Sequence, residues 1–375
     1  MAGLLALSPS GRVGVGWLYD FSALTSRIHE WLLAHCSPFM ATLLEYVIIG
    51  TCVIGLCVFL GISFVYMERK VAAFMQIRLG PNRVGPKGLL QAVADVLKLL
   101  LKEGIIPQAS DKFLFNLAPF IVMMVAMLAL APIPFALGLQ MYDINIGVFY
   151  ISAVSSISVI GILMAGWASN SKYSLLGAMR SGAQIVSYEL SAGLSIIVIV
   201  ALAGSMSMND IVESQRTGWW IFKGHIPAII AFVIFIIAGT AELNRAPFDM
   251  AEAESELTAG FHTEYTGMRF AMFFLAEYVN MFTICAIGAT LFLGGWMPFH
   301  IGHWEGFNHI MDYIPSVVWF FGKTFFLIFV IMWFRWTFPR LRIDQLLTLE
   351  WKYLMPVSLA NMILVALIVI MGWHF

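Results

Sequence analysis

The sequence predicts an all-α protein that crosses a membrane about eight times. Of its 375 residues, 60% are apolar and only 11% are charged, whereas soluble domains are about 45–50% apolar and about 25% charged. The mean hydropathy is +0.86. The apolar residues lie in long runs rather than in alternating segments of about ten residues, which favours helices over a β-barrel. This composition excludes soluble enzymes, disordered chains, collagens and nucleic-acid binders.

Eight apolar runs are long enough to cross the hydrocarbon core, which requires about 20 residues. In chain order they are Tyr46–Met67, Phe113–Tyr142, Ile144–Ser171, Leu175–Asn209, Gly224–Ala241, Phe270–Trp304, Tyr313–Phe334 and Tyr353–Phe375. Residues 1–40 are more polar and are predicted to be an amino-terminal extension with an interfacial helix at Phe21–His35. Residues 41–375 are predicted to form a single membrane domain.

Lysine and arginine predict the orientation, because basic residues concentrate in cytoplasmic loops. The loops after the first, third, fifth and seventh spans contain most of the 21 basic residues. We therefore expect these four loops in the cytoplasm. Because the number of spans is even, both chain termini are expected on the opposite side.

The first of these loops, from Glu68 to Lys112, combines a rigid turn with an amphipathic segment. Two Gly-Pro pairs lie within seven residues, at Gly80-Pro81 and Gly85-Pro86, and they predict a sharp bend. The segment Lys87–Glu103 then has helical periodicity with a single polar stripe, which predicts a helix on the membrane surface. Either this helix only connects two spans, or it walls a cavity that opens at the membrane surface. The length of the loop favours the second alternative.

The loop between the fifth and sixth spans, residues 242–269, is rich in acidic residues. Together with the start of the sixth span it contains Glu242, Asp249, Glu252, Glu254, Glu256, Glu264 and Glu277. Crowding of like charges raises carboxylate pKa values. Aromatic residues among the acids, such as Phe248, predict a loop folded against protein. The alternatives are a solvated loop that docks a basic partner and a functional group of proton-binding carboxyls.

Two acidic residues lie inside predicted spans: Glu189 near the middle of the fourth, and Glu277 about two turns into the sixth. A charge at the bilayer centre costs about 2.5–3.5 kcal/mol on insertion scales, and such residues usually face the bundle interior and mark proton relays. The alternative is a protonated glutamate hydrogen-bonded to the neighbouring Tyr188 or Tyr278.

Other polar residues have simpler explanations. Lys323 and Glu45 lie nearer the outer interface, where their side chains can snorkel to water. None of the four cysteines belongs to a Cys-x-x-Cys pair, so an iron–sulfur cluster bound by this chain is not expected. His300 and His303 lack the surrounding carboxylates typical of a metal site.

Several of these segments together resemble one protein family. The matching segments are Glu68-Arg69-Lys70, Arg78-Leu79-Gly80-Pro81-Asn82, Ser187-Tyr188-Glu189, Ala241–Asp249, Glu252–Leu257, Ala276-Glu277-Tyr278 and Arg340–Gln345. Over residues 42–375 the pattern is similar to the quinone-binding membrane subunit of respiratory complex I, the proton-pumping NADH:quinone oxidoreductase of bacteria and mitochondria. The chain length and the amino-terminal extension favour a multi-pass protein of the bacterial inner membrane over a mitochondrial one. The termini expected on the side opposite the cytoplasm are then periplasmic.

The resemblance implies that the chain walls a tunnel for ubiquinone or menaquinone and couples quinone reduction to proton translocation. The residues implied at the tunnel are Glu68, Arg69, Phe261, Arg340 and Arg342. Those implied on the proton path are Glu189, Asp249, Glu252, Glu254, Glu264 and Glu277. The implied partners are the peripheral subunits that form the quinone site and carry the last iron–sulfur cluster, the small neighbouring membrane subunits and the antiporter-like subunits. No metal, flavin or redox centre is expected on this chain itself.

Two alternative functions remain. The related membrane subunit of an energy-converting hydrogenase shares much of this architecture but serves proton reduction, and the complete Arg78–Pro86 turn favours the quinone enzyme. A stand-alone secondary transporter is less consistent with the sequence, because its two halves show no visible repeat.

Overall fold

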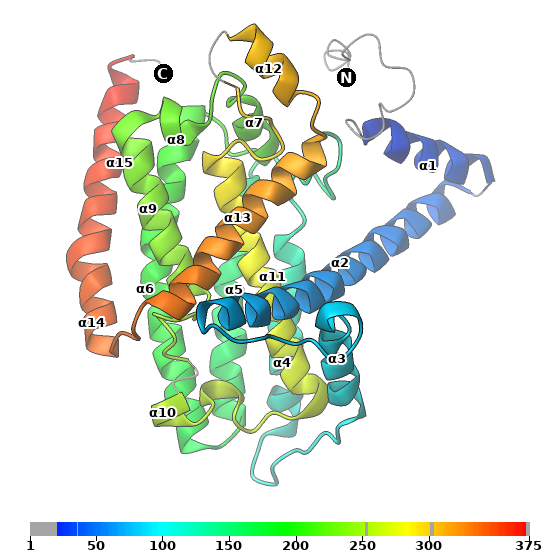
Figure 1. The fold of residues 1–375 in the computed structure, drawn as a ribbon, viewed down its shortest axis with the longest axis vertical. Coiled ribbons are helices and arrows are strands. Elements are labelled where there is room, and N and C mark those ends of the chain that lie inside the picture. Colours follow the sequence, from blue (N-terminus) through cyan, green and yellow to red (C-terminus); the bar gives the residue numbers. More distant parts are fainter. Residues whose placement is uncertain (1–20, 36, 252–253, 301–303, 373–375) are drawn as a thin grey trace.

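The computed structural model describes residues 21–372, except Cys36, residues 252–253 and residues 301–303. Within these residues the chain is helical and forms no β-strand (Figure 1). The longer helices are α1 (Ser22–His35), α2 (Pro38–Met75), α3 (Gln91–Leu101), α4 (Lys112–Ala129), α5 (Gly147–Ala168), α6 (Lys172–Ala203), α9 (His225–Glu242), α11 (Gly267–Phe292), α13 (Ser316–Thr337) and α15 (Met355–Ile370). The short elements are η2 (Pro86–Gly88), α7 (Met208–Glu213), α8 (Trp220–Lys223), α10 (Glu254–Leu257), η3 (Gly260–His262), α12 (Glu305–Met311), α14 (Ile343–Thr348) and the π-helical turn η4 (Leu349–Leu354).

Eight helical segments among the described residues are long and apolar enough to cross a membrane, which confirms the predicted fold class. They are α2, α4, α5, α6, α9, α11, α13 and the continuous segment from α14 to α15. Three predicted spans extend past the ends of their helices. The helices in the runs Phe113–Tyr142, Leu175–Asn209 and Phe270–Trp304 end at Ala129, Ala203 and Phe292. Most of the described residues that directly follow Ala129 and Phe292 are apolar and buried in loops. Apolarity alone does not distinguish such a loop from a helix.

Helix α11 lies at the centre of the bundle. It packs against α4, α13, α2 and α9, and its last turns are buried around the whole circumference. A helix that is apolar on every side belongs in the interior of a bundle. Helix α11 therefore holds the acidic loop at one end, because this loop leads directly into it.

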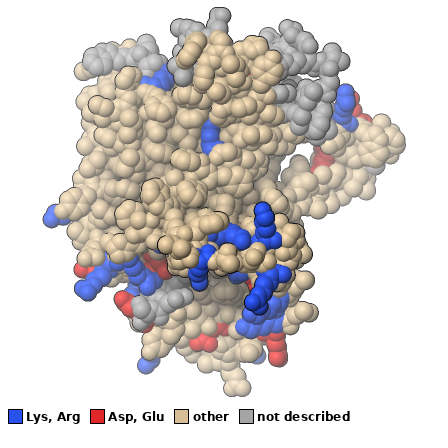
Figure 2. Space-filling model, viewed as in Figure 1, with Lys and Arg blue, Asp and Glu red and all other residues tan. Residues whose placement is uncertain are grey.

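Charged side chains gather at one end of the molecule. Figure 2 shows lysine, arginine and acidic residues around the lower end, where Figure 1 places α3 and α10, and few in the broad band above. The end of α15 and the short helices α7 and α12 lie at the upper end. An uncharged band with a charged end is the pattern expected of a helical membrane protein.

The predicted surface helix is present as α3, and it is anchored by its polar side. Asp95 accepts from Arg69 of α2 at 2.5 Å and from Gln91 at 3.3 Å. Leu97 and Leu100 are exposed instead, as expected of a helix that faces lipid or an apolar ligand rather than water. The preceding turn requires glycine at Gly88, where φ is +80° and a Cβ atom would lie 2.2 Å from a backbone oxygen.

A helix also covers the predicted interfacial segment, as α1. It joins α2 through His29, whose Nδ1 lies 2.5 Å from Glu45 Oε1. Glu45 thus has a protein partner. Whether α1 lies at the membrane interface stays a prediction.

The prediction that Lys323 snorkels to the outer interface is wrong. Its side chain on α13 is only 7% exposed, and its Nζ donates to the backbone oxygens of Gly295 (2.9 Å) and Met297 (2.6 Å). Nζ also lies 4.6 Å from the ring centre of Trp219. A buried ammonium needs such partners, and the carbonyls beyond the end of a helix need donors. Lys323 therefore holds the loop that follows α11.

The close approach of α6 to the acidic loop gives a stability prediction. A Cβ atom at Gly177 would lie 2.8–2.9 Å from the backbone of Gly260 and Phe261. We expect Gly177→Ala to displace η3 and to destabilise the protein by about 1–3 kcal/mol, as overpacking does. Gly55→Ala on α2 is the control, because no atom lies within 4 Å of a Cβ there. Thermal unfolding of the detergent-solubilised complex is the measurement, and equal melting temperatures for the two variants would contradict the prediction.

Candidate functional site

An ion cluster lies where α2, α11 and α13 meet the loop after α9. Its members are Glu68, Arg245, Glu277, Tyr278 and Arg335. Arg245 Nη1 donates to Glu68 Oε2 at 2.8 Å, and Arg245 Nε lies 2.6 Å from Glu277 Oε1. Arg335 pairs with Glu68 Oε1, and the Tyr278 hydroxyl donates to Glu68 Oε2 at 2.7 Å. With all groups ionised except the tyrosine, two positive charges balance two negative ones.

Arg245 is the most enclosed cation of this ion cluster, with only 3% of its surface exposed. Burial by itself would lower the pKa of Arg245, but the carboxylates of Glu277 and Glu68 raise it well above its ordinary value. Its guanidinium also lies 4.7 Å from the ring centre of Tyr278, a favourable cation–π position. Arg245 therefore stays positively charged, and the two glutamates depend on it because a buried charge without its partner is costly.

A cleft of about 450 Å³ lies beside the ion cluster. Its apolar lining includes Val65, Ala72, Phe274 and Trp336, and its charged lining includes Glu68, Arg69, Arg78, Arg245, Glu277 and Arg335. The Gly-Pro turn predicted from the sequence contributes Gly80 and Pro81 to one wall. An apolar wall with a few convergent polar groups is typical of a site for an organic ligand with a polar head.

Two smaller cavities follow the ion cluster into the bundle. The first, of about 60 Å³, is lined by Glu277, Glu242 and Asn280. The second, of about 80 Å³, is lined by Glu242, Asn280 and Glu189 together with serines of α5. Glu277 thus borders both the cleft and the first cavity, and Glu242 borders both cavities. The three acids form a carboxyl file, Glu277–Glu242–Glu189, separated by spaces large enough for water.

Neither acid predicted within a span bonds to the tyrosine beside it. Glu189 accepts a hydrogen bond from the hydroxyl of Ser156 on α5. Tyr188 instead donates to a backbone oxygen of α14 at 3.0 Å. Tyr278 donates to Glu68 rather than to Glu277. Glu189 therefore borders the second cavity, and Glu277 borders the first cavity and pairs with Arg245. Their role as proton relays stays a prediction.

Phe261 and His262 form the loop-side wall of the first cavity. The Phe261 carbonyl accepts from the Ser174 hydroxyl at 2.8 Å, and its ring packs edge-on against Phe273 at 5.3 Å. Burial lowers the pKa of His262 to about 4. The imidazole is therefore neutral at physiological pH and adds no charge to the cavity.

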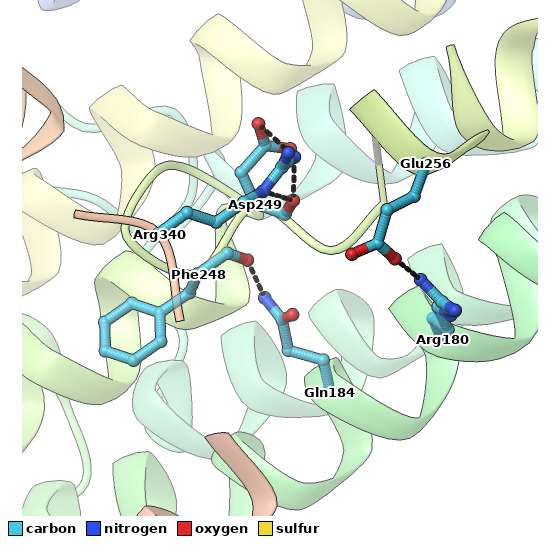
Figure 3. Close-up of polar contacts among 6 residues, drawn as sticks. All are labelled: Arg180, Gln184, Phe248, Asp249, Glu256 and Arg340. Atoms are coloured by element: carbon cyan, nitrogen blue, oxygen red, sulfur yellow. Dashed lines mark hydrogen bonds and ion pairs between the residues drawn. The ribbon is translucent and has the colours of Figure 1, made fainter. Parts of the chain in front are cut away.

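The acidic loop is folded against α6 and the segment before α14, as predicted (Figure 3). Arg340 donates to the Asp249 carboxylate at 3.0 Å and to the Asp249 backbone oxygen at 2.5 Å. Arg180 of α6 pairs with Glu256 at 2.6 Å, and this hydrogen bond lowers the pKa of Glu256. Gln184 Nε2 donates to a loop carbonyl at 2.6 Å. These contacts fix the position of the loop relative to the carboxyl file.

The structure does not bring the residues implied for one tunnel together at a single place. Glu68 and Arg69 line the cleft, whereas Phe261 lines the first cavity. Arg340 lies on Asp249, and Arg342 is exposed at the start of α14. The cleft and the first cavity share Glu277 and Phe274, so Phe261 is joined to the cleft only through them.

Among the remaining acids of the predicted proton path, only Glu264 is described with its side chain. Glu264 is half-buried in the loop before α11. Glu252 lies outside the described residues, and of Glu254 only the backbone, at the start of α10, is described. Their part in the path stays a prediction.

Three charged residues of the ion cluster and the carboxyl file were not predicted from the sequence to be site residues. Glu242 was expected only as one of the acids of the acidic loop, and Arg245 and Arg335 were not among the residues implied at the tunnel or on the proton path. A signal existed for Arg245, since it is one of only two basic residues among seven acids. No local signal identified Arg335, because its partner Glu68 is 267 positions away.

Comparison with known proteins identifies the family. The sequence model described as NADH dehydrogenase matches residues 47–366. An NADH-quinone oxidoreductase subunit of Bacteroides fragilis is 59% identical over 358 residues, which cover 96% of this chain and all of the relative. The corresponding NADH-quinone oxidoreductase subunit of Brevibacillus brevis is 49% identical over 89% of this chain and 96% of its own length. The NADH-quinone oxidoreductase subunit 8 of Rhodothermus marinus is 51% identical over 81% of this chain and 91% of its own length. The chain therefore belongs to this family of NADH-quinone oxidoreductase subunits, which are membrane subunits of respiratory complex I.

Proposed function

We propose that the chain walls the quinone-access path of complex I and couples quinone reduction to proton translocation through its buried carboxyls. One observation supports this proposal above the others. The ion cluster borders the cleft on one side, and through Glu277 it borders the carboxyl file on the other. A change of charge in the cleft therefore acts directly on the first acid of the file.

The cleft suits a quinone as the substrate. A quinone has a long apolar tail and a head with two carbonyl oxygens. The cleft offers apolar walls for the body and the guanidinium groups of Arg69, Arg245 and Arg335 for the head. Helix α3 exposes leucines beside it, which supports entry from the lipid. Ubiquinone and menaquinone both satisfy these requirements.

In the proposed mechanism, quinone takes up two electrons from a partner subunit and two protons to become quinol. Negative charge that develops on the head attracts the guanidinium groups of the ion cluster away from their glutamates. A carboxylate that loses its cation binds a proton. Protonation of Glu277 then passes along the carboxyl file through Glu242 to Glu189, and waters in the two cavities carry the proton between them. Asp249, Glu252, Glu254 and Glu264 are proposed to transmit the movement of the loop.

The same mechanism implies an orientation in the membrane and a set of partner subunits. The charged end of the molecule faces the bacterial cytoplasm and contacts the peripheral subunits that form the quinone site and hold the last iron–sulfur cluster. Small membrane subunits and antiporter-like subunits continue the path from Glu189. Both chain termini are periplasmic. The names of the relatives favour quinone reduction over the alternative of a hydrogenase subunit.

The buried cation of the ion cluster gives the first functional prediction. Arg245→Met removes the partner of two glutamates, a change that costs about 3–5 kcal/mol for a buried pair. We expect quinone reduction by the assembled complex to fall at least about tenfold, whereas electron transfer from NADH to ferricyanide persists. Arg245→Lys keeps the charge and should retain more activity. Arg216→Met, at an exposed arginine, is the control, and equal quinone activity in all three variants would refute the role of the ion cluster.

The carboxyl file gives the second prediction. We expect Glu277→Gln, Glu242→Gln and Glu189→Gln each to lower proton pumping at least about tenfold, because an amide cannot exchange a proton with the next acid. Pumping and quinone reduction are measured together in proteoliposomes. Glu213→Gln, at an exposed glutamate on α7, is the control. The relay is excluded if Glu189→Gln and Glu277→Gln both retain fully coupled pumping.

The position of the substrate gives the third prediction. A photoreactive quinone analogue added to the intact complex should label peptides within residues 68–83 or 248–270, and unlabelled quinone should compete. These segments border the cleft and the first cavity. Labelling confined to other subunits would leave this chain without a substrate-binding role.

A further inference from the structure

A buried acid lies outside the carboxyl file. Glu350, in the π-helical turn η4, is only 1% exposed. Its Oε1 accepts a hydrogen bond from the hydroxyl of Ser191 on α6. Its Oε2 is buried and has no hydrogen-bond partner among the described residues. An unpartnered buried acceptor is destabilising, and π-helical turns are frequent at functional sites.

Glu350 faces a row of polar residues on one side of α6. The row consists of Gln184, Tyr188, Ser191 and Ser195, which are spaced by four, three and four residues and therefore share a helix face. All four side chains are buried. Side chains of this row bond to residues of α9, α14 and η4, whereas Glu189 borders the second cavity with residues of α5 and α11. Helix α6 thus carries two polar faces, and only one belongs to the carboxyl file.

The row also contacts the acidic loop. Gln184 Nε2 donates to the backbone oxygens of Phe248 (2.6 Å) and Ala241 (2.7 Å), as Figure 3 shows for Phe248. The ring of Tyr188 lies 5.5 Å from that of Phe248, and the Tyr188 hydroxyl donates to the Leu346 oxygen at 3.0 Å. The segment that carries Asp249 is therefore packed on the same face of α6 as Glu350.

The charges around Glu350 leave an ionised carboxylate without a counterion among the described residues. Glu350 interacts electrostatically with Tyr188, a neutral hydroxyl, and it bonds to Ser191. Lys352, two positions further on, is exposed and lies over the ring of Tyr353. Gln184 Oε1 in the same row is a second buried acceptor without a partner among these residues. In the described part of the chain, the Glu350 carboxylate thus has one oxygen without a donor and no cation beside it, and a proton on Oε2 removes both the charge and the unpartnered acceptor.

We propose that Glu350 is a further proton-binding carboxyl of this subunit, separate from the carboxyl file, which binds and releases a proton as the acidic loop moves against α6. Binding forms an O–H bond on Oε2 with a proton taken from water, and release returns it, without electron transfer. Movement of Phe248 changes the hydrogen bonds of Gln184 and the position of Tyr188, and these alter the surroundings of Glu350. The inference rests on the proposed function in one respect, because quinone reduction drives the loop.

Infrared difference spectroscopy of the assembled complex in membranes tests the proposal. Spectra of the oxidised and the NADH-reduced complex should differ by a carboxylic acid C=O band that is present in the wild type and lost in Glu350→Gln. Glu213→Gln, at an exposed glutamate, is the matched control and should keep the band. Ser191→Ala should keep the band but shift its frequency, because the hydrogen bond to Oε1 is lost. A Glu350→Gln spectrum that superimposes on the wild type overturns the proposal.

Two further measurements make the result unambiguous. If Glu350→Gln does not assemble, the spectrum of Ser191→Ala decides, and the absence of any band shift overturns the proposal. The proposed function is judged separately, by proton pumping in Glu277→Gln, a variant that leaves Glu350 and its row unchanged. Loss of pumping in Glu277→Gln with an unchanged spectrum in Glu350→Gln therefore refutes this inference alone.

Discussion

The arrangement of the bundle depends on the pairing of Arg245 with Glu68 and Glu277. Lipid gives apolar helices little reason to prefer one neighbour over another, so packing and polar contacts select the arrangement. Arg245 lies on the loop after α9, and its two partners lie on α2 and α11. Arg335 adds α13 through the same Glu68. One buried cation and its carboxylates thus fix four segments from distant parts of the chain around a single point.

This point is also where the cleft meets the interior. The ion cluster is neutral when its two arginines and two glutamates are ionised, and one of its members, Glu277, borders both the cleft and the first cavity of the carboxyl file. In the proposed function, charge that develops in the cleft unbalances the ion cluster, and the imbalance is relieved by protons in the file. The interactions that position the helices then also transmit the signal. A structure held by apolar packing alone would have no such coupling.

The acidic loop is connected to both polar faces of α6. Arg180 and Gln184 hold it on α6, and Arg340 holds it beside α14. Glu242 at its beginning belongs to the carboxyl file, while Phe248 packs on the row that faces Glu350. A displacement of this loop therefore reaches two separate groups of buried carboxyls. At the other end of α11, Lys323 holds the following loop in place through hydrogen bonds to its backbone oxygens.

The sequence by itself determined the helical membrane class, the number of spans, the short helix between the first two spans and the acids that lie within spans. These properties are local, because each spanning segment must be apolar and must satisfy its own backbone hydrogen bonds. The resemblance in the loops also predicted the family correctly. Only the tertiary structure decided where apolar runs stop being helices and which charges pair. Arg335 meets Glu68, Arg340 meets Asp249, and Lys323 is buried rather than snorkelling. Each of these outcomes depends on a helix or loop brought close by folding, and a charge in the sequence does not specify its partner.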